Sequence, residues 1–223
     1  MYFLRTPLLD LSADIQQELI RAIHDNELIP TGMNENKNKL PFEQAIPPNI
    51  DANRKEYLRS IYYNYNALGY TLNSKLDTEI KLFYNKFLSF VNEEPRITVK
   101  RVMADEFLPL HSDRMQTVSV ATLINGSGPV TEWYEIKEEY KAPYLINGKL
   151  KGQALPMEHE VTKVAEHQIN AWESILFDHR SVHKVVNKTT NNKIDRWFLS
   201  IGWINVTHDE ASEAYKKYQN DCI

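Results

Sequence analysis

The sequence predicts a mostly β, α+β fold in which a β-sandwich or barrel carries helices on one outer face. Apolar residues recur at helical spacing in the first part of the chain, and strand-like alternation replaces that spacing after Pro95. The chain has 223 residues, of which 42% are hydrophobic and 25% charged, so it can bury a sizeable core. We therefore expect a single domain. Its expected parts are helical support at 1–95, a β-rich core at 96–205 and a C-terminal helix at 206–223.

Three helices are expected in the first part of the chain. Ser12 is a suitable N-cap for the first helix, whose apolar residues follow at a spacing of three to four. The stretch 31–50 is rich in Asn and Lys and is predicted to be a loop. A second helix is expected around 57–65. Ser74 and Asp77 form a capping-box pattern ahead of the third helix.

Strands rich in β-branched and aromatic residues follow. Their expected ranges are 97–103, 117–124, 130–136, 159–164, 172–178, 182–187 and 194–204. Asn147-Gly148 suits the two-residue turn of a β-hairpin, and a short polar helix is expected at 209–219.

The last strand indicates how the layers are arranged. Because side chains alternate along a strand, Trp197 lies on one face, predicted to pack under the helices, and Arg196 lies on the other. Arg196 is therefore expected to point into the barrel. A buried guanidinium is costly unless an anion meets it, so this position predicts a site for an anionic group.

Composition excludes several classes of function. The net charge is −4 without a basic stripe, so no nucleic-acid partner is expected. The seven glycines form no dinucleotide or P-loop motif, and the single cysteine, Cys222, excludes a Cys-rich zinc site. No signal-peptide pattern or membrane-spanning apolar run is visible, so we expect a cytoplasmic protein with no membrane partner. The oligomeric state stays open.

His111, Asp113 and His183 form the candidate metal site. His111 and Asp113 are two residues apart at the expected start of a strand, where alternate residues share a face, and His183 lies on a later strand. Two imidazoles and one carboxylate on one face leave coordination positions open, as is typical of non-haem Fe(II) oxygenases. Arg196 would then pair with the distal carboxylate of a bidentate cosubstrate. Alternatively, Asp113 is only a strand-entry residue and another acid, such as Glu132, binds the metal.

The ordered pattern His111-x-Asp113, His183 and Arg196 resembles that of the 2-oxoglutarate/Fe(II)-dependent oxygenase superfamily, and within it the prolyl-hydroxylase-like and small phage or bacterial branch. The resemblance spans about residues 96–205. It implies a double-stranded β-helix of the jelly-roll or cupin-like type. It also implies Fe(II) as the metal, with 2-oxoglutarate and dioxygen as cosubstrates.

Residue by residue, the resemblance implies iron at the three candidate ligands and the C5 carboxylate of 2-oxoglutarate on Arg196. Ser200 lies four residues further along the same strand face and would offer that carboxylate a hydroxyl. The run 131–134 is also similar to this branch, and Tyr134 is the candidate for a further contact to cosubstrate or substrate.

The implied activity is hydroxylation of a small molecule such as an amino acid, coupled to decarboxylation of 2-oxoglutarate to succinate. Arg101 and Arg114 are candidate anchors for an acidic group of the substrate, and the segment 138–157 is a candidate lid. Alternatives are a prolyl-type protein hydroxylase, a hydrolase or isomerase with another divalent metal, and a cupin-like binding module without turnover.

Several of these residues have a competing interpretation. His179 precedes His183 by four residues, but its surroundings predict a turn, so we prefer His183 as the ligand. Arg196 could form a buried structural ion pair instead of binding a ligand. Arg101 could be a surface residue or pair with an acid in the range 105–106.

Overall fold

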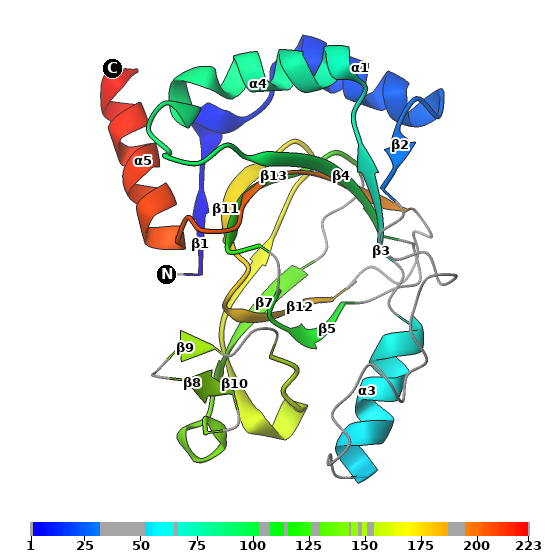
Figure 1. The fold of residues 1–223 in the computed structure, drawn as a ribbon, viewed down its shortest axis with the longest axis vertical. Helices are drawn as coiled ribbons and strands as arrows, with labels where there is room; N and C mark the ends of the chain where they lie inside the picture. Colours follow the sequence, from blue (N-terminus) through cyan, green and yellow to red (C-terminus); the bar gives the residue numbers. More distant parts are fainter. Residues whose placement is uncertain are drawn as a thin grey trace.

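Two antiparallel β-sheets face each other, and helices cover the outside of the larger sheet (Figure 1). The structure is a computed structural model that describes residues 2–31, 52–64, 67–102, 108–113, 116–125, 130–142, 144–146, 149–150, 154–186 and 195–222. Within these ranges, no helix combines the length and the apolar character needed to cross a membrane. The predicted loop at 32–50 lies outside the described residues.

The helices are α1 (Ala13–His24), α3 (Ala52–Asn64), α4 (Ser74–Leu88) and α5 (His208–Asp221). The first strands are β1 (Phe3–Arg5), β2 (Ile29–Pro30), β3 (Ala67–Thr71), β4 (Arg96–Val102), β5 (Leu108–His111), β6 (Val118–Leu123) and β7 (Val130–Ile136). The later strands are β8 (Leu145–Ile146), β9 (Lys149–Leu150), β10 (Val161–Gln168), β11 (Ser174–Asp178), β12 (Val182–Val186) and β13 (Arg196–Trp203).

The strand order identifies the architecture. The 7-stranded sheet has the order β1-β11-β6-β13-β4-β3-β2, and the 4-stranded sheet has the order β10-β7-β12-β5. From β4 onward the chain alternates between the two sheets, except that β7 and β10 are antiparallel neighbours in the smaller one. This winding is the double-stranded β-helix of jelly-roll proteins. The predicted fold class is confirmed, and β1, β2 and β3 are additional strands on the larger sheet.

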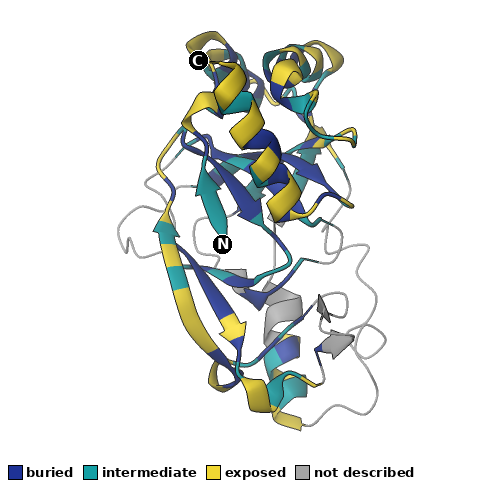
Figure 2. Cartoon of the chain, turned by 90° about the vertical axis from the view of Figure 1, so that its left-hand side faces the viewer, coloured by how far each residue is buried: buried dark blue, intermediate teal, exposed yellow. Residues whose placement is uncertain are grey.

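Strand β13 separates two apolar layers, as its alternation predicts. Leu199, Ile201 and Trp203 are at most 1% exposed and belong to the main core, together with residues of α1, α4 and α5. On the opposite face, Phe198 packs toward a second core between the two sheets that contains Trp133. Figure 2 shows that buried residues gather on most of the strands, whereas exposed residues lie on the outer sides of the helices and along the edge strand β10.

Of the two predicted N-caps, one differs from the structure by a residue and the other agrees with it. The N-cap of α4 is Asn73, whose side chain accepts a hydrogen bond of 2.9 Å from the Leu76 amide, and Ser74 is the first helical residue. Both residue types favour N-caps, so the sequence alone could not decide between neighbours. Ser12 is the N-cap residue of α1, although its side chain makes no capping hydrogen bond.

Helix α3 departs from the expected arrangement, because it lies away from α1 and α4, on the side of the smaller sheet (Figure 1). The Arg54 guanidinium donates to Glu160 and to the hydroxyl of Tyr144, and Leu58 is 7% exposed. Helical periodicity identifies the apolar stripe of α3 but not the sheet on which it packs, so the prediction of one common face was wrong for this helix.

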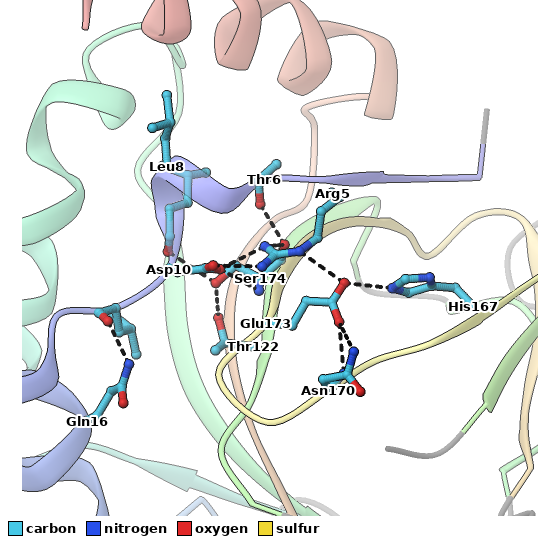
Figure 3. Close-up of polar contacts among 12 residues, drawn as sticks. Arg5, Thr6, Leu8, Asp10, Gln16, Thr122, His167, Asn170, Glu173 and Ser174 are labelled. Carbon is cyan, nitrogen blue, oxygen red and sulfur yellow. Dashed lines mark hydrogen bonds and ion pairs between the residues drawn. The ribbon is translucent and has the colours of Figure 1, made fainter. Parts of the chain in front are cut away.

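The unpredicted strand β1 is attached to β11 by a polar network (Figure 3). The Arg5 guanidinium donates to Asp10 at 2.7 Å and to the Ser174 carbonyl at 2.8 Å, and it lies 3.0 Å from the Glu173 carboxylate. Glu173 also contacts His167 Nε2 at 2.9 Å. The network holds the N-terminal strand on the edge of the larger sheet.

The start of β11 differs from the prediction, and the predicted hairpin is described only in its two strands. Strand β11 begins at Ser174, because Trp172 lies in a turn with a left-handed φ of 64°. Strands β8 and β9 pair antiparallel on either side of the predicted hairpin turn, with Leu145 opposite Leu150. The turn residues themselves lie outside the described residues.

Candidate metal centre

His111 and His183 are direct neighbours across the smaller sheet. They are register partners in β5 and β12, and their ring centroids are 4.3 Å apart. Both are buried, at 5% and 3% exposure. The His183 Nδ1–H donates to the carbonyl of Ser181 at 2.9 Å, which fixes the ring and leaves Nε2 with a free lone pair.

Asp113 joins the two histidines from the loop after β5. Its Oδ1 atom lies 3.5 Å from His111 Nε2, and one potential ligand atom from each of Asp113, His111 and His183 lies within 4.8 Å of the others. The expectation that the motif opens a strand was wrong, since His111 is the last residue of β5. Asp113 is therefore held by loop hydrogen bonds and not by strand alternation.

The electrostatics of these side chains favour the protonation states that bind a cation. Burial raises the pKa of Asp113, but the neighbouring His179 and His111 overcome this effect and hold it well below its usual range. Burial, followed by repulsion from His111, lowers the pKa of His183 to about 3. An ionised carboxylate next to neutral imidazole is the donor set that divalent metals require.

His179, which the sequence analysis considered only as an alternative metal ligand, lies at the site in a different position. It lies in the predicted turn, but its side chain is 7% exposed and hydrogen-bonds through Nδ1 to Asp113 Oδ2. Its Nε2 atom lies 2.8 Å from the hydroxyl oxygen of Ser119 on β6. Burial lowers the pKa of His179, although the Asp113 carboxylate opposes this shift.

Ser112, between the two ligands of the motif, is held by the segment that was a candidate lid. Its amide donates to the Ala154 carbonyl at 2.9 Å, and its hydroxyl accepts from the Ala154 amide at 2.8 Å. Ala154 is 1% exposed. The end of the segment 138–157 is thus fixed to the loop that carries Asp113.

The candidate ligands face a cavity between the two sheets, which Arg196 and Ser200 also line from the inner face of β13. Arg196 is 3% exposed. The side-chain amide of Gln116 donates to Ser200 Oγ at 3.2 Å. It also fills the space next to Gly202, because a Cβ atom at that position would lie 1.6 Å from Gln116 Nε2. The apolar part of the lining consists of Val102, Ala121, Ile169, Phe177, Val185 and Phe198.

Arg101 is not among the residues that line this cavity. Its guanidinium donates to Asp195 at 2.8 Å and lies 5.4 Å from the centre of the Trp197 ring, on the outer face of β4. The prediction that it points to the pocket was wrong, because the face it shares with Val99 packs on the helix side. Its neighbour Lys100 lines the cavity instead.

Tyr134 and Glu132 also lie outside the cavity. Trp133 is the register partner of His183, so alternation turns its neighbours to the outer face of the smaller sheet. There the Tyr134 hydroxyl donates to Glu132 at 2.6 Å. The expectation of a cosubstrate contact at Tyr134 was therefore wrong, and so was the alternative of Glu132 as a metal ligand. Arg114 lies outside the described residues.

Comparisons with known proteins give distant structural similarity only. No protein-family model and no curated protein sequence matches the chain. A Pseudomonas putida prolyl-4-hydroxylase aligns at 15% identity over 91% of each chain, with a TM-score of 0.41. HygX from Streptomyces hygroscopicus, with nickel, 2-oxoglutarate and hygromycin B bound, aligns at 9% identity over 92% of this chain and 84% of that chain, with a TM-score of 0.43. The epimerase SnoN, in complex with Fe3+, alpha-ketoglutarate and nogalamycin RO, aligns at 11% identity over 89% and 78%, with a TM-score of 0.44.

Proposed function

We propose that the protein is an Fe(II)/2-oxoglutarate-dependent oxygenase that hydroxylates a small molecule such as an amino acid. One observation carries the proposal: two buried histidines and one carboxylate converge on a point in a cavity that also contains a buried arginine. The residues concerned are His111, Asp113, His183 and Arg196.

The donor set fits Fe(II). Imidazole and carboxylate suit this ion, and three protein ligands leave positions open for a bidentate cosubstrate and dioxygen. The Asp113 carboxylate offsets only one of the two positive charges of Fe(II), so the centre stays cationic and favours an anionic cosubstrate. When bound, the iron and its cosubstrates supply the oxidation, in which 2-oxoglutarate gives succinate and carbon dioxide and a C–H bond of the substrate becomes C–OH.

Arg196 and Ser200 are the proposed contacts for the distal carboxylate of 2-oxoglutarate. The three candidate ligands, Arg196 and Ser200 line the same cavity between the two sheets. A molecule with carboxylates at both ends would bind the iron through one end and the Arg196 guanidinium through the other. Burial strengthens a charge-assisted contact of this kind.

The apolar residues of the cavity have a different task. Phe177, Phe198 and Ile169 surround the polar centre, and Phe177 contacts the His183 ring at a centroid distance of 4.8 Å. Such a lining excludes water from the reacting atoms and presents an apolar surface to a C–H bond.

An anaerobic titration tests the proposal. Fe(II) and then 2-oxoglutarate are added to the protein, and the visible metal-to-ligand charge-transfer band is recorded. We expect the band, and succinate formation once oxygen is admitted. Metal binding without the band would indicate a hydrolase or isomerase with another cofactor chemistry, and metal binding without any turnover would indicate a binding module.

The substrate class needs a second measurement. Succinate formation is scored against free amino acids and against proline-containing peptides. We expect stimulation by at least one free amino acid. Stimulation by the peptides alone would contradict this part of the proposal and favour a prolyl-type protein hydroxylase.

A further inference from the structure

We propose that His179 is a positioning residue that fixes the Asp113 carboxylate, so that one oxygen is tied to the protein and the other is presented to the metal. The inference rests on the proposed metal site. It assigns a function to a buried histidine that is not itself one of the three converging ligands.

Two separate bonds connect the same pair of residues. The Asp113 amide donates to the His179 carbonyl at 2.8 Å, and the His179 side chain contacts Asp113 Oδ2. The His179 amide in turn donates to the Thr117 carbonyl at 3.0 Å, next to the start of β6. The turn before β12 therefore holds the loop after β5 against the start of β6, at the position of Asp113.

The direction of the side-chain bond follows from the chemistry of its partners. An ionised carboxylate only accepts hydrogen bonds, so His179 Nδ1 carries the proton and donates it to Asp113 Oδ2. The neutral ring then accepts at Nε2 from the Ser119 hydroxyl, 2.8 Å away. The carboxylate thus sets the tautomer of His179, and the Ser119 hydroxyl holds the ring in place from its other side, in the way that partners outside a ligand set orient metal ligands.

This arrangement distinguishes the two carboxylate oxygens. Oδ2 is engaged by His179, whereas Oδ1 lies on the side of His111 Nε2, 3.5 Å away. Ser119 is fully buried and His179 nearly so, which leaves little room for water to replace the imidazole. Without His179, the carboxylate of Asp113 can rotate, and the ligand geometry is no longer fixed.

The same contacts argue against His179 as a metal ligand. Both of its ring nitrogens are engaged, one by Asp113 and one by Ser119. The His183 ring, by contrast, bonds through Nδ1 to the Ser181 carbonyl at 2.9 Å, and within the described part of the chain its Nε2 atom has no hydrogen-bond partner. This difference favours His183 as the metal ligand and His179 as the residue that positions Asp113.

The test measures Co(II) binding by calorimetry and by the visible spectrum of the bound ion, without cosubstrate. We expect His179→Ala to weaken Co(II) binding about 10- to 100-fold and to change the spectrum. His179→Asn retains an N–H donor near the position of Nδ1, so it should recover most of the affinity. Ser119→Ala removes the hydrogen bond that orients the His179 ring, with little change in volume, and it should cause a smaller loss in the same direction.

The matched control is His167→Ala. His167 also bonds a carboxylate, Glu173, at 2.9 Å (Figure 3). It belongs to β10, at the edge of the smaller sheet, and it is not among the residues that line the cavity. This variant should bind Co(II) as the parent does. Parent-like affinity in both His179→Ala and Ser119→Ala would overturn the inference, as would equal losses in His179→Asn and His179→Ala. If His179→Ala does not fold, Ser119→Ala decides alone.

Asp113→Ala separates this inference from the function on which it rests. If Asp113→Ala loses Co(II) while the His179 and Ser119 variants keep it, the metal site stands and the positioning role falls. If Asp113→Ala binds Co(II) like the parent, both the proposed metal site and the positioning role fall.

Discussion

Replacing Arg196 by Met is expected to remove the 2-oxoglutarate site while leaving the metal site intact. Arg196 is 3% exposed and lines the cavity from β13, whereas the metal ligands come from other segments. Methionine fills a similar volume without a charge, so the inner face of the barrel stays packed.

The size of the effect follows from the burial of the contact. Losing one partner of a buried, charge-assisted pair costs about 2–5 kcal/mol. At about 1.4 kcal/mol per tenfold change, this corresponds to a roughly 30-fold to several-thousandfold weaker affinity for 2-oxoglutarate. Fe(II) affinity, measured without cosubstrate, should change little, because Arg196 belongs to no part of the donor set.

The assay is an anaerobic titration of the iron-loaded protein with 2-oxoglutarate, followed by the visible charge-transfer band. Arg101→Met is the matched control, since Arg101 lies on the neighbouring strand but on the outer face, bonded to Asp195. Unchanged cosubstrate affinity in Arg196→Met would refute the assignment. Equal weakening in both variants would show that the effect comes from charge or stability and not from a contact.

Four further outcomes are expected. Asp113→Ala should lose both Fe(II) binding and 2-oxoglutarate decarboxylation, and iron binding like that of the parent would contradict the proposed three ligands. The parent protein should hydroxylate its substrate and not halogenate it in chloride buffer, which mass spectrometry of the product checks. His183→Ala should abolish iron binding at neutral pH, where the parent imidazole is neutral because burial lowers its pKa to about 3; metal analysis checks this. Burial raises the pKa of Glu173, but Asn170, His167 and Arg5 outweigh this and lower it, so Glu173→Gln should cost about 1–2 kcal/mol of stability at pH 7. That difference should fade as the pH falls through the depressed carboxyl pKa, and a pH-independent difference in urea unfolding would contradict it.

The sequence predicted the main strands because their residues alternate or are apolar over several positions. It did not predict β1, β2, β3 or β5, which have two to five residues. Strands this short contain too little alternation to be recognised, and their conformation depends on a partner such as β11 or β3. Tertiary contacts, for example those of Arg5 with Asp10 and Glu173, hold β1 in place.

Alternation also leaves one question open in every strand: which of its two faces points inward. For β13 the aromatic residues of one face and Arg196 on the other gave the right answer. For β4 and β7 the sequence pattern favoured the wrong face. Arg101 and Tyr134 were therefore expected in the cavity, but Lys100 and Thr131 line it instead. A shift of one position reverses every inward assignment, and only the pairing register determines it.

His179 shows a different limit, because a turn residue has no periodicity from which its direction could be predicted. Its side chain is placed by Asp113, 66 positions earlier, and by Ser119, 60 positions earlier. Ser112 is held in the same way by Ala154. These bonds connect groups of the protein, so they hold Ser112 and Asp113 in addition to any bond that the ion makes. A centre prepared in this way spends less free energy on ordering its ligands when the metal arrives. The residues that tie the loop down should therefore affect metal affinity even though none of them touches the ion.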